Sequence, residues 1–201
     1  MLRVVCVCTG NVCRSPQAEQ LLRAGLGPAL QGEVEISSAG TAAGDGAQMT
    51  EPAAAWSRAL GGDPAAHRSR YLTPRVLRDA DLVLGMAREH RREVVGLAPA
   101  LTKTTFTLRE LARLAAGVDG DELAAAAEAA GTDPRDRLRA LLGLLGRRRG
   151  SGPPPADPAA DDVVDPINRA AEVYEQSARQ VEDALPPVLG LLRLATRTTR
   201  A

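Results

Sequence analysis

The sequence predicts an α/β fold, namely a doubly wound, four-stranded parallel sheet with helices on both faces. The first observation behind this prediction is the alternation of strand-like and helix-like segments through residues 1–114. The second is the shortness of the connections between those segments. Strand–helix–strand order with short connections favours a parallel sheet with right-handed crossovers.

Four segments have the composition of buried strands. Arg3–Cys8 is a β-branched run without polar alternation, which is typical of a parallel strand covered on both faces. The other predicted strands are Val34–Ala39, Asp81–Met86 and Thr104–Thr107.

Helix signals fall between these strands. Ser15 is expected to cap a helix that has Pro16 at its first position, because serine caps and proline opens helices. The other helices predicted in this part of the chain are Glu51–Leu60, a short helix from Pro74, and Arg88–Leu97.

Residues 115–160 differ in composition from the sequence on either side. Asp121–Ala130 is alanine-rich and Asp136–Arg148 is amphipathic, so both could be helical, whereas Pro153–Pro155 favours a mobile linker. We therefore expect one domain over residues 1–201 that carries a mobile or helical insertion at about 115–160.

A last helix is predicted from about Arg169 to Leu185. Pro186 and Pro187 should break or kink it before the apolar segment Val188–Leu194, because proline lacks the backbone N–H that a helix interior needs.

The composition excludes several classes of protein. The 25 basic and 25 acidic side chains of the 201 residues cancel, which argues against a nonspecific binder of nucleic acid or anionic membrane. No apolar run approaches the roughly 18 residues of a membrane span, and the start of the chain does not read as a signal peptide. We expect a cytoplasmic protein. The clustered, odd set Cys6, Cys8 and Cys13 is no disulfide framework and indicates reactive chemistry.

The segment Val7–Pro16 carries the strongest functional signal. Cys8 lies six residues before Arg14, between a predicted strand and a helix start, and the intervening Gly10 and Asn11 tolerate left-handed backbone. Such a loop directs successive backbone N–H groups toward a common centre beside a helix N-terminus. Both features favour an oxyanion such as phosphate.

The side chains of this loop have complementary chemical roles. Among N–H donors, Cys8 should exist as the nucleophilic thiolate, and Ser15 can donate its hydroxyl to it. Arg14 can bind two phosphoryl oxygens through its planar fork. Asn11 can hold the loop by side-chain hydrogen bonds to the backbone. An inert buried Cys8 and a surface Arg14 are the alternative, which leaves the rest of the segment unexplained.

These ten residues resemble the signature of the low-molecular-weight protein tyrosine phosphatase family. Further blocks follow in the family's order: Ser38–Thr41, His67–Arg70, Asp81–Met86, Asp165–Pro166 and Tyr174–Glu175. The resemblance covers most of the chain outside the insertion and implies a protein-tyrosine-phosphatase that uses cysteine.

The resemblance implies a mechanism with a phosphocysteine intermediate on Cys8. Arg14 and the loop amides would bind the phosphoryl oxygens, and Asp165 would be the general acid and then the general base. Asp161 and Asp162 are rivals, but only Asp165 precedes proline as in the family pattern. The implied phosphate-binding residues are Thr9, Gly10, Asn11, Val12, Cys13, Arg14 and Ser15. The implied loop supports are Asn11, Ser15, Ser38 and His67.

The other cysteines have separate interpretations. The resemblance implies that Cys13 can form a reversible disulfide with Cys8, although Cys13 could equally be a small buried side chain. Cys6 is interpreted as core. A zinc site from the three cysteines and His67 has the wrong spacing. Neither a metal nor an organic cofactor is expected, since Arg14 and the backbone amides supply the positive charge.

The sequence departs from the family where aromatic side chains line the phosphotyrosine slot. The positions concerned are Ala43–Asp45 and Ile167–Asn168, which contain no aromatic residue. Trp56 or Tyr71 could compensate, and the insertion could cover the site as a lid. A phosphorylated protein or a small aryl phosphate is the expected substrate.

The sequence also bears on three alternative functions. An arsenate reductase would need cysteines beyond Cys13, and the sequence has none. Phosphoarginine phosphatases of the family carry threonine where this chain has Val12. The aliphatic side chain of Val12 therefore favours aryl phosphates as substrates. A phosphate-sensing module that hydrolyses poorly would not need Cys8, Arg14 and Asp165 together.

Overall fold

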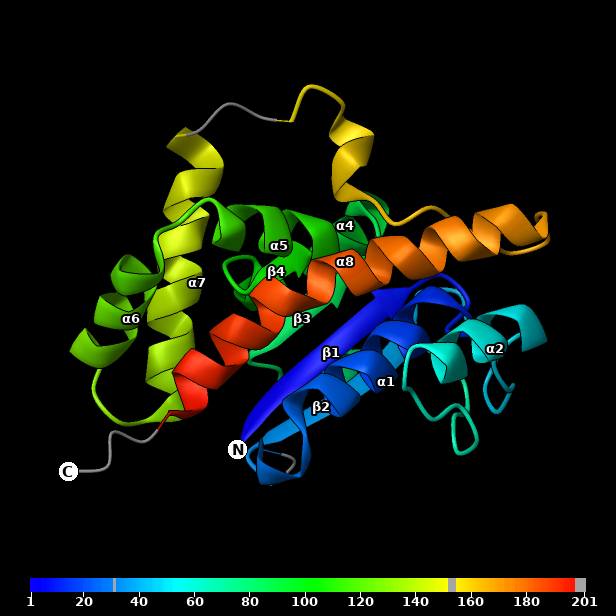
Figure 1. Cartoon of the computed structure of the whole chain (residues 1–201), viewed down its shortest axis with the longest axis horizontal. Coiled ribbons are helices and arrows are strands. Elements are labelled where there is room, and N and C mark those ends of the chain that lie inside the picture. The colour runs from blue at the N-terminus through cyan, green and yellow to red at the C-terminus, as the bar shows by residue number, and fades with distance from the viewer. Residues whose placement is uncertain (31, 152–154, 198–201) are drawn as a thin grey trace.

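The computed structural model describes residues 1–30, 32–151 and 155–197 of the chain. Its centre is one parallel sheet in the order β2-β1-β3-β4 (Figure 1). The strands are β1 Leu2–Cys8, β2 Val34–Gly40, β3 Leu82–Gly85 and β4 Thr105–Thr107. The predicted four-stranded parallel sheet is therefore confirmed, and each predicted strand differs from the observed one by at most a residue at either end.

Helices account for most of the remaining chain. The α-helices are α1 Arg14–Leu26, α2 Glu51–Ala59, α3 Pro74–Leu77, α4 Arg88–Leu97, α5 Leu108–Ala116, α6 Gly120–Ala129, α7 Pro134–Ser151 and α8 Ala171–Thr196. Short 3₁₀ helices are η1 Pro28–Leu30, η2 Pro99–Leu101 and η3 Pro158–Asp161.

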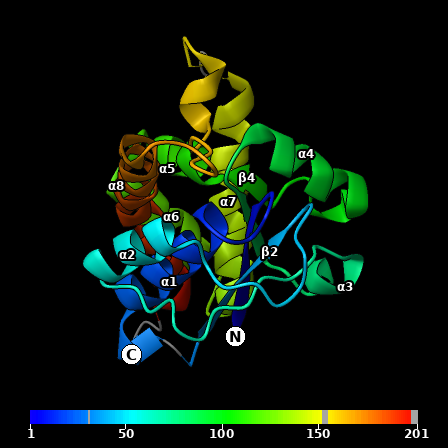
Figure 2. The same ribbon diagram turned by 90° about the vertical axis from the view of Figure 1, so that its right-hand side faces the viewer.

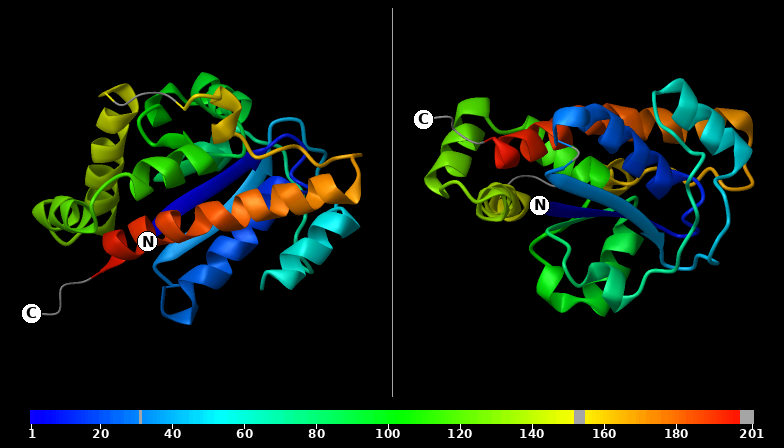
Figure 3. Two further views of the ribbon diagram at one scale, coloured as in Figure 1. Left: turned by 45° about the horizontal axis from the view of Figure 1, so that its top comes forward. Right: turned by 90° about the horizontal axis from the view of Figure 1, so that it is seen from below.

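The central strand β1 explains why both faces of the sheet are covered. Its side chains alternate between two apolar clusters, so that Val4 and Cys6 pack under α1, α5 and α8 while Val5 and Val7 pack under α3 and α4. The right-hand view of Figure 3, from below, shows helices on both sides of the strands. The continuous apolar run of β1 is what such two-sided burial requires.

The stretch predicted as an insertion contains the helices α6 and α7. Leu138, Leu141 and Leu145 of α7 are fully buried in the same cluster as α5 and α8. Both helices lie at the end of the molecule away from α2, and not over the loop after β1 (Figure 1). The predicted linker at Pro153–Pro155 lies outside the described residues except for its last position.

Two local predictions are wrong. Helix α1 begins at Arg14 with Cys13 at its N-cap position, so Ser15 is not the cap and its hydroxyl serves another purpose described below. Helix α8 continues through Pro186 and Pro187, so the break that was one of the two predicted outcomes does not occur. Its buried leucines and valines on both sides of the prolines hold it against the core, and this packing outweighs the missing backbone hydrogen bonds. Among the described helices, none is long and apolar enough to cross a membrane.

Candidate active site

The loop between β1 and α1 lies at the carboxyl ends of the strands, where ligands of parallel sheets bind. Figure 2 views the molecule from this end, with the loop surrounded by the start of α4, the segment after β2 and the segment before α8. Two donors converge there on the Cys8 sulfur. The backbone N–H of Asn11 lies 3.2 Å from Sγ, and the Ser15 hydroxyl lies 3.0 Å from it. Both donors stabilise negative charge on the sulfur.

Asn11 organises the loop. Its backbone has a φ of 54°, in the left-handed region where asparagine is tolerated. Its side-chain amide donates to the hydroxyls of Ser15 and Ser38 at 3.0 and 2.8 Å. Its side-chain oxygen accepts the backbone N–H of Arg70 at 3.0 Å, and its backbone oxygen lies 2.7 Å from His67 Nε2. The structure therefore brings Asn11, Ser15, Ser38 and His67 into one network.

Gly40, at the end of β2, lets the loop approach the sheet closely. A Cβ atom at this position would overlap the carbonyl oxygen of Thr9 and the backbone nitrogen of Asn11. The two segments are joined by backbone hydrogen bonds of 2.9 Å from Thr41 to Cys8 and from Ala42 to Thr9. Only glycine allows this approach without moving the loop.

Arg14 points into the site. It is 3% exposed, and its guanidinium donates to the backbone oxygen of Val163 at 3.2 Å and to Thr9 Oγ1 at 3.4 Å. Its Nη2 atom also forms an ion pair of 2.8 Å with Asp165 Oδ2. The arginine thus joins the loop after β1 to the segment that precedes α8.

Asp165 is the carboxylate that the structure places at Arg14. Its side chain is 44% exposed, and its second oxygen accepts the backbone N–H of Ile167 at 3.3 Å. The rivals are bound elsewhere: Asp161 pairs with Arg113 at 2.9 Å and Asp162 with Arg88 at 3.0 Å. Of the three candidates, only Asp165 has this ion pair with Arg14.

Sequence reasoning missed a second histidine at the site. His90, in the first turn of α4, is buried, and its Nε2 atom lies 3.0 Å from Thr9 Oγ1. Burial, and to a lesser degree the nearby Arg14 charge, lower the pKa of His90 to about 4. A signal was available, because a histidine soon after a predicted parallel strand lies at the same edge of the sheet as the loop.

The buried, neutral state of His90 predicts a pH dependence of stability. The unfolded histidine binds a proton near pH 6.5 but the folded one only near pH 4, so the free energy of unfolding should decrease as the pH falls through this window. Between pH 7 and pH 5 this decrease should be about 2 kcal/mol larger in the wild type than in His90→Gln. Urea unfolding of both proteins at the two pH values measures it. Equal decreases would contradict the assignment.

The other cysteines are protonated thiols. Burial raises the pKa of Cys6 well above its usual value and that of Cys13 to about 11, although a hydrogen bond with Thr50, 3.2 Å away, partly opposes the shift at Cys13. All three cysteines are free. In the described part of the chain, no group of three metal-ligating side chains could hold a metal ion.

Two exposed apolar side chains lie next to segments of the site. Tyr71 is 51% exposed, and its backbone N–H donates to Asp45 Oδ1 at 2.8 Å, which places it beside the segment after β2. Ile167 is 39% exposed and follows Asp165 by two residues. Trp56 instead packs between Arg179 of α8, at 5.2 Å from its ring, and the small apolar cluster around Met49 and Tyr174.

Comparison with known proteins identifies the class to which this site belongs. The family model described as low molecular weight phosphotyrosine protein phosphatase matches residues 3–121. The chain therefore belongs to the low-molecular-weight protein tyrosine phosphatases, which are cysteine-dependent phosphatases.

Individual relatives carry two substrate names. The chain is 37% identical over 108 residues to the "Probable low molecular weight protein-tyrosine-phosphatase EpsP" of Ralstonia solanacearum, covering 54% of this chain and 71% of that protein. It is 38% identical over 119 residues to the protein-arginine-phosphatase of Geobacillus stearothermophilus, covering 59% and 75%. The solved YwlE arginine phosphatase of the same organism superposes with a TM-score of 0.64 at 26% identity, covering 94% of this chain and 91% of that one.

Proposed function

We propose that this chain hydrolyses phosphomonoesters by way of a phosphocysteine on Cys8. The observation that carries the proposal is that Cys8, Arg14 and Asp165 come together at the loop after β1. Two groups donate hydrogen bonds to the Cys8 sulfur, at 3.2 and 3.0 Å. The Arg14–Asp165 ion pair, at 2.8 Å, joins the loop to residues 161–165, called the acid segment below. A two-step phosphoryl transfer requires a nucleophile, a group that binds the phosphoryl oxygens and a proton donor.

In the first step the Cys8 thiolate attacks phosphorus, and an S–P bond forms as the P–O bond to the leaving group breaks. Arg14 and the backbone N–H groups of residues 9–15 bind the three remaining phosphoryl oxygens, where charge accumulates. Protonated Asp165 gives its proton to the leaving oxygen. Arg14 already reaches both the loop, at Thr9, and Asp165, so the acid lies next to the group that would bind the phosphoryl oxygens.

In the second step water attacks the phosphocysteine. Asp165, now a carboxylate, accepts a proton from that water, and the S–P bond breaks to release phosphate and the Cys8 thiolate. The Ser15 hydroxyl, which donates to the sulfur at 3.0 Å, stabilises the departing thiolate. Asn11 holds Ser15 in this position through its side-chain amide.

Aryl phosphates, including phosphotyrosine, are the substrate class we propose. The side chain of Val12 is aliphatic and packs on the apolar cluster around Met49 and Tyr174. Because it has no polar atom, it cannot accept a hydrogen bond from a guanidinium group. Tyr71 and Ile167 could supply apolar walls for an aromatic ring, since each is exposed beside a segment of the site. Phosphoarginine is the second candidate, because a relative with similar identity is named an arginine phosphatase.

A substrate panel tests this proposal. Peptides carrying phosphotyrosine, phosphoarginine or phosphoserine are compared by kcat/KM, and acid-quenched enzyme is analysed for phosphate on Cys8. We expect a trapped phosphocysteine and the highest kcat/KM with phosphotyrosine. Higher kcat/KM with phosphoarginine would change the substrate class, and phosphate release without phosphate on Cys8 would refute the mechanism.

The proposed redox role of Cys13 yields a separate prediction. Peroxide converts the Cys8 thiolate to a sulfenic acid, which the Cys13 thiol can condense with to form a disulfide and water. A reducing thiol should then restore most activity of the wild type and several-fold less of Cys13→Ser. Cys6→Ala is the control, because Cys6 points into the core. Equal recovery of wild type and Cys13→Ser would exclude the role. A disulfide that thiols reverse also fits the reducing cytoplasm, where we propose that the protein acts.

A further inference from the structure

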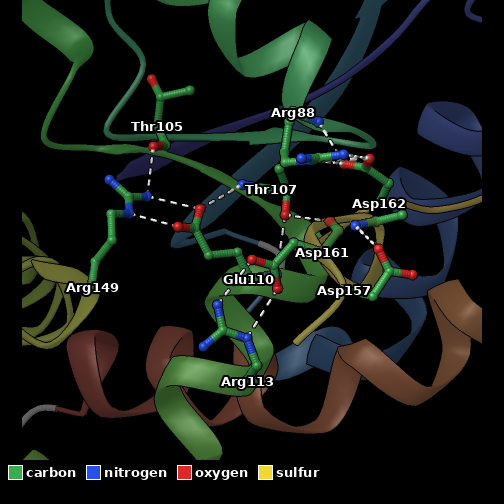
Figure 4. Close-up of polar contacts among 10 residues, drawn as sticks. Arg88, Thr105, Thr107, Glu110, Arg113, Arg149, Asp157, Asp161 and Asp162 are labelled. Atoms are coloured by element: carbon green, nitrogen blue, oxygen red, sulfur yellow. Dashed lines mark hydrogen bonds and ion pairs between the residues drawn. The ribbon is translucent and has the colours of Figure 1, made fainter. Parts of the chain in front are cut away.

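The segment before Asp165 is held to the body of the protein at consecutive residues (Figure 4). The carboxylate of Asp161 accepts two hydrogen bonds from Arg113 of α5, at 3.0 and 2.9 Å. The backbone oxygen of Asp161 accepts the hydroxyl of Thr107 at 2.6 Å. Asp161 is buried, and these contacts define the position of its backbone.

The next two residues continue this attachment. The Asp162 carboxylate accepts the backbone and side-chain nitrogens of Arg88, the first residue of α4, at 2.8 to 3.2 Å. Val163 donates its backbone N–H to Met86 at 2.7 Å and accepts Arg14 through its carbonyl oxygen. Asp165 follows two residues later. Its reach to Arg14 therefore depends on where residues 161–163 are fixed.

Helix α7 is connected to the same attachment. Arg149 of α7 donates two hydrogen bonds to Glu110, at 2.6 and 2.9 Å, and stacks over the Phe106 ring at 4.0 Å. Glu110 in turn accepts the backbone N–H of Thr107 at 3.3 Å, while Thr107 Oγ1 accepts the backbone N–H of Glu110 at 3.1 Å. The same Thr107 hydroxyl donates to Asp161. The contacts thus run from Arg149 through Glu110 and Thr107 to the acid segment.

We propose that Arg113, together with Arg149 of α7, positions Asp165 for proton transfer. The inference rests on the proposed role of Asp165 and assigns α7 a part in the reaction. Proton transfer requires donor and acceptor within about 2.6–3.2 Å, so a small displacement of the acid segment is enough to impair it. Arg113 and Arg149 are positioning residues, since Arg113 reaches Asp165 through Asp161, and Arg149 through Glu110 and Thr107.

Substrates with different leaving groups separate this role from a loss of stability. Phenolate is a strong base and needs a proton as it leaves, whereas p-nitrophenolate needs it much less. In Arg113→Gln and Arg149→Gln, kcat/KM for phenyl phosphate should fall by about tenfold, and for p-nitrophenyl phosphate by less than about threefold. General destabilisation would lower both values by the same factor. If Arg113→Gln does not fold, Arg113→Lys replaces it, because lysine keeps the charge but loses the two-pronged geometry.

Arg148→Gln is the matched control. Arg148 neighbours Arg149 on α7 and pairs with Glu122 of α6 at 2.8 Å, without contact to the acid segment. It should leave both kcat/KM values unchanged. An equal loss with both substrates in the Arg113 and Arg149 variants, or a leaving-group-dependent loss in Arg148→Gln, would overturn the inference.

A double variant distinguishes failure of this inference from failure of the proposed function. If Arg113 acts through Asp165, then Arg113→Gln should lower kcat/KM for phenyl phosphate no further once Asp165 is alanine. If Asp165→Ala itself shows no leaving-group dependence, the proposed acid role is wrong. If Asp165→Ala shows that dependence but the Arg113→Gln effect adds in full to it, only the positioning inference is wrong.

Discussion

Replacing Cys8 by serine is expected to lower kcat for every phosphomonoester by about 10⁴-fold or more. Serine keeps the size of the side chain and can accept the hydrogen bonds that Asn11 and Ser15 donate to the sulfur. The loop should therefore keep its shape. A neutral hydroxyl, however, is a far weaker nucleophile than a thiolate held by two donors. Steady-state turnover of p-nitrophenyl phosphate measures the loss.

Phosphate binding provides the control for this variant. Because serine removes a negative charge from the bottom of the loop, Cys8→Ser should bind inorganic phosphate at least as tightly as the wild type. The increase in melting temperature with added phosphate reports this binding. Turnover within tenfold of the wild type would show that Cys8 is not the nucleophile. Lost turnover together with lost phosphate stabilisation would instead mean that the loop had collapsed.

Replacing Asp165 by alanine is expected to produce the second-largest loss, about 10²- to 10⁴-fold in kcat/KM for phenyl phosphate. The loss for p-nitrophenyl phosphate should be much smaller, because its leaving group departs without a proton. Hydrolysis of the intermediate should also slow, since the base that activates water is missing. Phosphocysteine should then accumulate, which rapid-quench labelling detects.

Asp133→Ala is the comparison for that variant, since this aspartate caps the start of α7 and accepts the backbone N–H of Arg135 at 2.7 Å. It should leave kcat/KM unchanged for both substrates. Near-normal cleavage of phenyl phosphate by Asp165→Ala would remove Asp165 from the mechanism. Asp162, bound to Arg88 and only three residues away, would then be tested next.

The strands and the nucleophile loop could be predicted because their signals are local. An apolar β-branched run such as Arg3–Cys8 has few alternatives to a buried strand. The spacing of Cys8 and Arg14 has meaning only between a strand and a helix, and both neighbours could be read from the sequence. The assignment of Asp165, by contrast, depended on the family resemblance, because Asp161 and Asp162 offer the same chemistry a few residues earlier.

Other features depend on contacts between distant residues and were not predictable. Pro186 and Pro187 read as a break, but burial on both sides of them keeps α8 continuous. Ser15 read as a cap because the helix start could not be placed within one residue. The place of His90 after a predicted parallel strand indicated only the edge of the sheet on which it lies, and its contact with Thr9, 81 residues away in the sequence, depends on β3 lying next to β1.

The contact of Arg14 with Val163 spans 149 residues of sequence. Contacts of such high sequence separation close large loops and form late when a chain folds. The first third of the polypeptide can shape the sulfur's surroundings, but the proton donor arrives only when the stretch leading into α8 has docked. Appearance of enzymatic turnover during refolding should therefore lag behind the gain of helical signal, which makes catalysis a reporter of the last stage of chain assembly.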